Sequence, residues 1–178
     1  ATTISAANGG VVGIHAPGIA GVNNGVGNQT FSSTLNYGSG SIFEWDLSAA
    51  SASDIGVVAD GATGTYDTVV ANGAVTGGSA IFKVMLGGNT FADAFWDTDK
   101  SWSNIYSGTG APASLAAVFS SLAGAGVDAN GFVTGQGQFT FVGTALKWTA
   151  GAAPANPYDT WSAGLANPAF DFDSDNDG

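Results

Sequence analysis

The last residues of the chain alternate aspartate with other residues at a spacing that suits a hard cation. Asp173, Asp175 and Asp177 precede Gly178, which matches the first half of a D-x-D-x-D-G calcium loop. Alternate carboxylates in such a loop converge on one ion, and the glycine permits the sharp turn. Asp171, water or a neighbouring subunit could complete the coordination. We expect Ca²⁺ at Asp171, Asp173, Asp175 and Asp177, the alternative being a solvated acidic tail that binds nothing tightly.

His15 is the single histidine of the chain, so any Ser-His-Asp arrangement would have to use it. It lies between Gly13 and Pro17, and the sequence contains no G-x-S-x-G motif that would present a nucleophilic serine. We therefore interpret His15 as a packed or turn-flanking residue rather than a catalytic base.

Acidic and aromatic side chains stand close together in two parts of the sequence, as in sugar-binding clefts. The acids are Glu44, Asp46, Asp93, Asp97 and Asp99, and the tryptophans near them are Trp45, Trp96 and Trp102. Glycosidases use a pair of carboxyl groups, and the acid of the pair is commonly a glutamate, of which this chain has only one. We expect no enzymatic activity, and a carbohydrate-binding or adhesive surface is the alternative function.

The charge balance excludes several classes of partner. The chain of 178 residues has 3 lysines, no arginine and 14 acidic residues, which gives a formal charge of −11. Nucleic acids and anionic membrane surfaces require a basic face, which three lysines cannot provide. Every apolar run is interrupted well before the roughly 20 residues that a membrane-spanning helix needs. We expect no nucleic acid partner and no membrane span.

The composition is typical of secreted β-rich proteins. Only 10% of the residues are charged, against about a quarter in an ordinary soluble domain. The chain has 28 glycines and no cysteine, and the absence of cysteine excludes disulfides and thiolate chemistry without fixing the redox compartment. The chain starts at Ala1 rather than Met, as expected after removal of a signal peptide. We expect an extracellular or cell-surface location.

Short strands must position these candidate residues, because Gly, Asn and Pro interrupt the chain every few residues. The clearest strand is residues 41–47, in which Phe43, Trp45 and Leu47 fall on one face. Further strands are expected at residues 29–35, 66–71 and 80–86, and a hairpin is expected from residues 138–142 and 144–150 across Gly143.

Residues 80–86 repeat the pattern of residues 41–47 about 39 positions later. If the two strands pair in register, Glu44 and Lys83 meet on the outer face and gain up to about 1 kcal/mol. The alternative is two independently solvated charges.

One segment has helical periodicity. Residues 113–123 place Leu115, Val118, Phe119 and Leu122 at positions i, i+3, i+4 and i+7, which predicts a short helix within an insertion from Asn89 to Gly131. After Gly151 the composition changes to Ala, Pro and Asn. We therefore expect a β domain at residues 1–150, followed by a linker and Asp-rich tail at residues 151–178.

Several motifs resemble the autotransporter-associated β-strand repeat proteins, over roughly residues 9 to 149. The motifs are Ala16-Pro17-Gly18, Gln29-Thr30-Phe31, Gly38-Ser39-Gly40-Ser41-Ile42-Phe43-Glu44-Trp45-Asp46-Leu47, Tyr66-Asp67-Thr68-Val69-Val70 and Ile81-Phe82-Lys83-Val84. These secreted, Gly-rich proteins are common in Verrucomicrobia and Planctomycetes, many with a PEP-CTERM-type sorting tail. The resemblance implies a parallel β-solenoid at the cell surface. The Asp-rich tail is similar to the calcium segments of thrombospondin type 3 and dockerin-like repeats.

Together these patterns predict an all-β fold, a short parallel β-solenoid with one short helix in an insertion, or alternatively an antiparallel β-sandwich or jelly roll. Either fold exposes strand edges, and this chain has few of the Lys and Pro residues that normally prevent edges from associating. We expect a structural subunit that self-assembles into a filament or surface layer by β-edge or end-to-end contacts. Residues 1–14 and the tail after Gly151 are the expected contact elements, and the expected partners are copies of the same chain, with surface glycans in addition.

Overall fold

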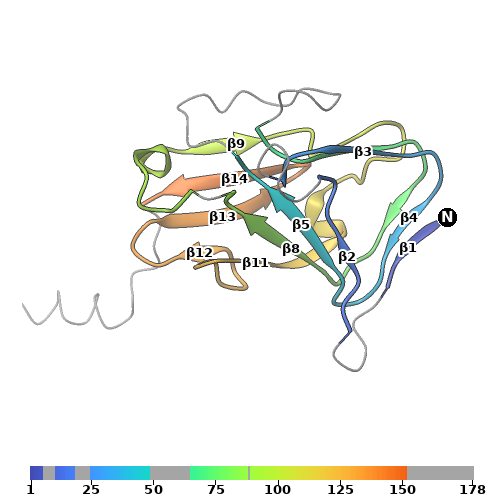
Figure 1. Cartoon of the computed structure of the whole chain (residues 1–178), viewed down its shortest axis with the longest axis horizontal. Helices are drawn as coiled ribbons and strands as arrows, with labels where there is room; N and C mark the ends of the chain where they lie inside the picture. Colours follow the sequence, from blue (N-terminus) through green and yellow to red (C-terminus); the bar gives the residue numbers. More distant parts are fainter. Residues whose placement is uncertain (6–10, 19–24, 49–64, 88, 152–178) are drawn as a thin grey trace, which may run out of the picture.

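The computed structural model describes residues 1–5, 11–18, 25–48, 65–87 and 89–151, and this part of the chain is all-β (Figure 1). The strands are β1 (Thr2–Ile4), β2 (Ile14–His15), β3 (Asn28–Phe31), β4 (Leu35–Tyr37), β5 (Ile42–Asp46), β6 (Thr68–Ala71), β7 (Val75–Thr76), β8 (Ala80–Met85), β9 (Lys100–Trp102), β10 (Tyr106–Ser107), β11 (Phe119–Gly124), β12 (Phe132–Val133), β13 (Gly137–Val142) and β14 (Ala145–Ala150). Two short 3₁₀ turns are η2 (Ala94–Asp97) and η3 (Leu115–Ala117).

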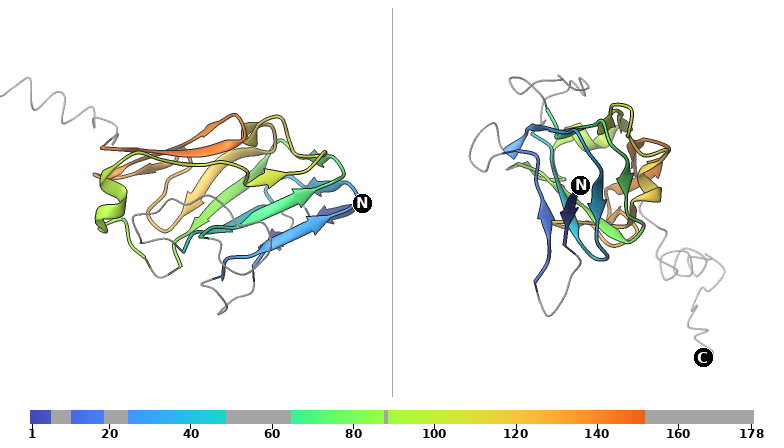
Figure 2. Two further views of the ribbon diagram at one scale, coloured as in Figure 1. Left: turned by 90° about the horizontal axis from the view of Figure 1, so that it is seen from above. Right: turned by 90° about the vertical axis from the view of Figure 1, so that its right-hand side faces the viewer.

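Of the four sheets in the described residues, three consist of parallel strands. The chain adds one strand to each of these three sheets in succession and then repeats the cycle. The first sheet has the order β1-β4-β7, the second β11-β8-β5-β2 and the third β10-β6-β3. Neighbours in each sheet therefore come from successive turns of the chain, with β1, β2 and β3 in the first turn and β4, β5 and β6 in the second. Figure 2 shows the first strands together at one end of the molecule.

The pairing of β5 with β8 confirms the repeat read from the sequence. Ile42 pairs with Ile81 and Phe43 with Phe82, in parallel and in register. Glu44 and Lys83, which are 39 residues apart, meet on the outer face with 2.8 Å between the Lys83 Nζ and Glu44 Oε1 atoms. The expected ion pair is thus confirmed.

The fourth sheet is antiparallel and has the order β12-β13-β14-β9. Its centre is the hairpin of β13 and β14, in which Phe139 lies opposite Trp148. The hairpin turns at Gly143, whose φ of 58° is a left-handed conformation that glycine adopts without strain. This hairpin confirms the sequence prediction.

The core lies where the antiparallel sheet packs over the inner face of the parallel sheet that contains β5, β8 and β11. Phe43 and Phe119 each meet the ring of Phe82 edge to face, with 5.3 Å between the ring centroids in both pairs. Phe141 of β13 joins them at 5.6 Å from Phe82. Trp148 and the tryptophans of the insertion extend this aromatic core, and such ring pairs contribute about 0.5–1.5 kcal/mol each beyond the area they bury.

The helix expected at residues 113–123 is wrong. This segment contains the 3₁₀ turn η3 and, from Phe119 on, most of strand β11. The register between β11 and β8 shifts between Phe119 and Ser121, so one extra residue is accommodated as a β-bulge. The bulge places Phe119 and Leu122 on the same buried side at a spacing of three, which imitates helical periodicity in the sequence.

The arrangement of the sheets is mixed, with parallel pairs in the turns and antiparallel pairs in the hairpin region. The loop expected at residues 48–64 and the tail at residues 151–178 lie almost entirely outside the described residues, so the division into domain and tail stays a prediction.

Candidate functional site

The calcium ligands expected from the sequence, Asp171, Asp173, Asp175 and Asp177, all lie outside the described residues. Among the residues that are described, no group of three His, Cys, Asp or Glu side chains could hold a metal ion. The calcium site therefore stays a prediction.

The acids and tryptophans expected to form a sugar-binding cleft have separate structural roles. Glu44 is ion-paired with Lys83, and Asp99 accepts a hydrogen bond from the Ala150 amide at 2.9 Å. Trp96 and Trp102 are each only 1% exposed, so neither ring can stack on a sugar at the surface. Trp96 instead packs against Trp148, with 5.1 Å between the ring centroids. The tryptophans of this cluster belong to the core, while Asp97 and Asp99 are exposed.

His15 is buried and joins a chain of polar side chains that links all three parallel sheets. Its Nε2 atom lies 2.6 Å from Oε1 of Gln29, and its Nδ1 atom is hydrogen-bonded to the Tyr37 hydroxyl. That hydroxyl lies 2.6 Å from the hydroxyl of Tyr106. Burial lowers the pKa of His15, which favours the neutral ring with its proton on Nε2. Nδ1 then accepts from Tyr37, and the network fixes the short strand β2 to its neighbours.

Asp67 is a second buried polar residue, and no sequence pattern predicted its burial. Its carboxylate accepts hydrogen bonds from the backbone amides of Gly27, at 2.6 Å, and Asp46, at 3.0 Å. Burial raises the pKa of Asp67 to about 7 from an ordinary value of 3.8, although the two amide donors oppose this rise. Burial also raises the pKa of Asp46, with a smaller contribution from Glu44. These contacts join the first and second turns.

The outer sides of β1, β2 and β3 have no strand partner within the described ranges, because each of the three is the last strand of its sheet. The side chains at this end are apolar or uncharged. Val11 is 73% exposed and Ile14 is 53% exposed. The first Asp, Glu, Lys or Arg in the sequence is Glu44, in the second turn. We call this surface, formed by β1, β2, β3 and Val11, the open end.

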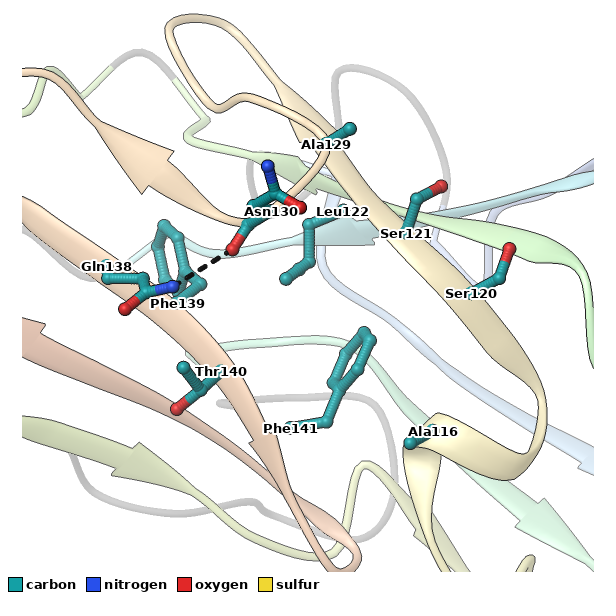
Figure 3. A pocket seen from close by; sticks show the side chains of 10 residues that line it. All are labelled: Ala116, Ser120, Ser121, Leu122, Ala129, Asn130, Gln138, Phe139, Thr140 and Phe141. Atoms are coloured by element: carbon teal, nitrogen blue, oxygen red, sulfur yellow. Dashed lines mark hydrogen bonds between the residues drawn. The ribbon is translucent and has the colours of Figure 1, made fainter. Parts of the chain in front are cut away.

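A groove of about 390 Å³ lies between β11 and β13, at the opposite edge of the parallel sheet that ends in β2 (Figure 3). Ser120 and Ser121 belong to its β11 wall, while Phe141 projects from β13 between the two strands. Gln138 donates a hydrogen bond through its Nε2 atom to the Asn130 carbonyl, at 3.2 Å. The ten residues that line the groove include no charged side chain. We call this feature the β11–β13 groove.

No known family, curated protein or solved structure matches the chain in the comparisons made. The resemblance to β-strand repeat proteins therefore stays a prediction. No helix in the described ranges is long and apolar enough to cross a membrane.

The sequence predicted residues 1–14 as a contact element, and that role stays a prediction; within this segment Val11 and Ile14 are exposed. Sequence reasoning missed the β11–β13 groove, because the lining residues come from three separate segments and the segment containing Ser120 resembled a helix. The Tyr37 and Tyr106 pair was also missed, and a separation of 69 residues leaves no local signal.

Proposed function

We propose that this protein is an extracellular structural subunit that assembles with copies of itself into a filament or surface layer. The observation that supports the proposal best is the open end, where the described residues of three neighbouring edge strands carry no charged side chain. Natural proteins normally protect such edges with Lys, Pro, bulges or covering segments. An unprotected edge offers its backbone amide and carbonyl groups to another strand.

The parallel strands are best interpreted as a short β-solenoid, to which the antiparallel hairpin region is added. The support for this interpretation is the rotation of the chain through three sheets, with in-register pairs such as Phe43 with Phe82. In a solenoid each turn contacts only its neighbours, so the first and last turns expose the surfaces by which turns stack. A solenoid is therefore suited to end-to-end assembly.

The charge distribution favours contact at the open end over contact elsewhere. A chain with a formal charge of −11 repels its copies wherever acidic surfaces approach. The open end is free of charged side chains, and it exposes Val11 and Ile14. Burying such apolar surface in a contact gains about 25 cal/mol per Å².

Calcium at Asp171, Asp173, Asp175 and Asp177 is part of the proposal, on the strength of the D-x-D-x-D spacing alone. Isothermal titration of the full chain with CaCl₂ tests it. Heat of binding that is lost when Asp173 and Asp175 are both changed to Asn supports the site, and an unchanged titration excludes it.

Sedimentation velocity of the full chain tests self-assembly. We expect concentration-dependent species larger than the monomer, and the Ile14→Lys variant should remain monomeric because the lysine places a charge on the β2 edge. Ser39→Lys is the matched control, since Ser39 is exposed in the turn between β4 and β5 and lies on no strand edge. Monomers alone at every concentration, or equal assembly by both variants, would contradict the proposal.

A further inference from the structure

The β11–β13 groove has two strand walls and an apolar floor (Figure 3). Ser120, Ser121 and Leu122 of β11 line one wall, and residues 138–141 of β13 line the other. Leu122 and Phe139 are buried, and their side chains contribute to the floor. The volume of about 390 Å³ lies within the range of roughly 300–1,000 Å³ that small-molecule sites in proteins occupy. The groove is therefore large enough for a small ligand.

Residues 127–133 border one end of the groove and bond to both of its walls. The Leu122 amide of β11 donates a hydrogen bond to the Ala129 carbonyl at 3.2 Å. The Phe139 amide of β13 donates to the Gly131 carbonyl at 2.8 Å. The backbone of the chain itself therefore holds the two walls in place, and the groove needs no ligand to form.

Asp128 holds Asn130 at this end of the groove. The Oδ1 atom of Asp128 accepts hydrogen bonds from the backbone amides of Asn130, at 2.8 Å, and of Phe132, at 2.9 Å. The Asn130 carbonyl in turn accepts from Nε2 of Gln138 at 3.2 Å. These bonds use only backbone groups of Asn130. Its exposed side-chain amide can therefore donate to a ligand and accept from it.

Hydroxyl and amide groups line both walls. Ser120 and Ser121 lie on β11, and Gln138 and Thr140 lie on β13. The Nε2 atom of Gln138 is bonded to the neighbouring segment, which leaves the Oε1 atom as an acceptor. Each serine and threonine hydroxyl can both donate and accept. The walls thus offer donors and acceptors without any formal charge.

Phe141 adds an aromatic ring between the two strands (Figure 3). Its ring centroid lies 5.6 Å from that of Phe82 and 6.3 Å from that of Phe119, so buried neighbours fix its position. The side chain is only partly buried, in contrast to Trp96 and Trp102. A fixed and partly exposed ring can pack against the C–H face of a sugar, whose hydroxyl groups then reach the polar walls.

We propose that the β11–β13 groove binds a short segment of a neutral carbohydrate chain. Phe141 packs against one sugar ring, while the side chains of Ser120, Ser121 and Asn130 exchange hydrogen bonds with its hydroxyl groups. The groove shares no residue with the open end. Carbohydrate binding is therefore a further function, in addition to the proposed assembly.

Charge favours a neutral ligand over an ionic one. None of the ten residues that line the groove is charged, and the chain as a whole carries −11. An anionic polysaccharide would meet long-range repulsion with no lysine in the groove to offset it. A cationic ligand would find no carboxylate among the lining residues.

The backbone bonds around the groove disfavour an added peptide strand. The Leu122 amide on one wall and the Phe139 amide on the other are already bonded to residues 127–133. Further along β11, Gly124 forms a bridge with Val127. A strand requires a regular series of free backbone partners along one edge. A sugar requires only the hydroxyl, amide and aromatic groups that the groove provides.

A carbohydrate array probed with the full chain tests the proposal. The array carries neutral hexasaccharides of glucose, mannose, galactose, xylose and N-acetylglucosamine, with alginate and heparin oligosaccharides as anionic controls. We expect binding to a neutral hexasaccharide and none to the anionic controls. Binding to none of the neutral sugars, or to the anionic controls alone, would overturn the inference.

Isothermal titration with the neutral hexasaccharide that binds best then locates the site. Phe141→Leu keeps an apolar side chain but removes the ring, and it should weaken binding by about tenfold. Phe91→Leu is the matched control and should bind as the natural chain does. Phe91 is also a partly buried ring, 5.7 Å from Trp148, but it does not line the groove. Equal affinities for the two variants would overturn the inference.

A variant of the wall keeps the test decisive if Phe141→Leu fails to fold. Ser120 is exposed, so Ser120→Glu should fold, and its carboxylate should occupy part of the groove and abolish binding. Ser39→Glu adds the same charge at an exposed turn residue outside the groove and should leave binding unchanged. Circular dichroism establishes that each variant is folded. Equal binding by the two glutamate variants would exclude the groove as the site.

Sedimentation velocity separates this inference from the proposed function. Ser120→Glu should assemble as Ser39→Glu does, because neither residue belongs to the open end. A chain that assembles but binds no neutral sugar overturns this inference alone. A chain that binds the sugar through the groove but stays monomeric supports this inference and overturns the proposed function.

Discussion

Asp67 and His15 are buried ionisable side chains. Burial raises the pKa of Asp67 and lowers the pKa of His15. Burial disfavours the charged form of both, so the carboxyl of Asp67 holds its proton to about pH 7 and the ring of His15 resists protonation. Both residues connect the first turn of the chain to the second, Asp67 through the Gly27 amide and His15 through Tyr37. The stability of the open end should therefore depend on pH through two separable groups.

Ionisation of Asp67 should lower the free energy of unfolding as pH rises. The folded chain binds this proton more tightly than the unfolded chain, because the pKa is about 7 when folded and 3.8 when unfolded. Stability from this group is full below about pH 4 and is lost as pH rises through about 7. Urea unfolding of Asp67→Asn should show a smaller decrease between about pH 4 and about pH 8 than the natural chain. The exposed Asp97→Asn control should keep the natural slope, and an equal slope in all three would contradict the assignment.

Protonation of His15 should have the opposite effect. Its folded pKa is lowered from 6.5, so the unfolded chain binds the proton more tightly and stability is lost as pH falls below about 6.5. NMR titration can measure this directly, since His15 is the only histidine. We expect a midpoint below 6.5 in the folded chain and near 6.5 in urea. A folded midpoint at or above 6.5 would show that the ring is not held neutral by burial.

The connections between strands pack closely against one another, and Gly73, which lies between β6 and β7, is an example. A Cβ atom at Gly73 would lie 2.3 Å from the Ser33 carbonyl carbon in the preceding turn. In the next turn, a Cβ atom at Gly110 would lie 2.0 Å from the Gly73 carbonyl oxygen. The connections that follow β3, β6 and β10 therefore approach one another closely, and glycine backbone makes this approach possible.

The Gly73→Ala substitution should force these turns apart. We expect the free energy of unfolding to fall by about 1–3 kcal/mol, the usual cost of overpacking. Ser39→Ala changes an exposed turn residue and should alter stability by less than about 0.5 kcal/mol. Urea unfolding with both variants measures the difference, and a Gly73→Ala variant as stable as the control would contradict the close stacking of the turns.

Elements with a strong local pattern were predictable from the sequence, and those formed by irregular pairing were not. The repeat that includes Phe43 and Phe82 gave the register of β5 and β8, and with it the Glu44–Lys83 ion pair. The bulge at Phe119 and Ser121 broke the strand alternation and produced a false helical pattern. The sequence shows that aromatic residues are dense around Trp96. It does not show whether their rings face solvent or the core, because that depends on the antiparallel sheet that covers them.

At the scale of the whole molecule, the described residues of the first turn carry no Asp, Glu, Lys or Arg side chain, and this is the surface at which assembly is proposed. The chain carries −11, and its first charged residue follows the whole of the first turn. In the proposed assembly, long-range repulsion between copies would oppose contact at the open end, and short-range apolar and backbone contacts would drive it.

Salt should promote assembly for this reason. Raising NaCl from about 0.01 M to about 1 M shortens the screening length from about 30 Å to about 3 Å and removes most of the repulsion between copies. We expect the assembled fraction in sedimentation to increase with salt. A decrease would show instead that ion pairs hold the contact.

Fibre diffraction from aligned assemblies tests most directly whether copies of this chain stack as a continuous series of parallel strands. Strands that lie across the fibre axis repeat along it at about 4.8 Å. We expect a meridional reflection at this spacing from the natural chain and no aligned fibres from Ile14→Lys. Fibres without a meridional reflection near 4.8 Å, or a natural chain that remains monomeric at high concentration, would contradict assembly through the open end.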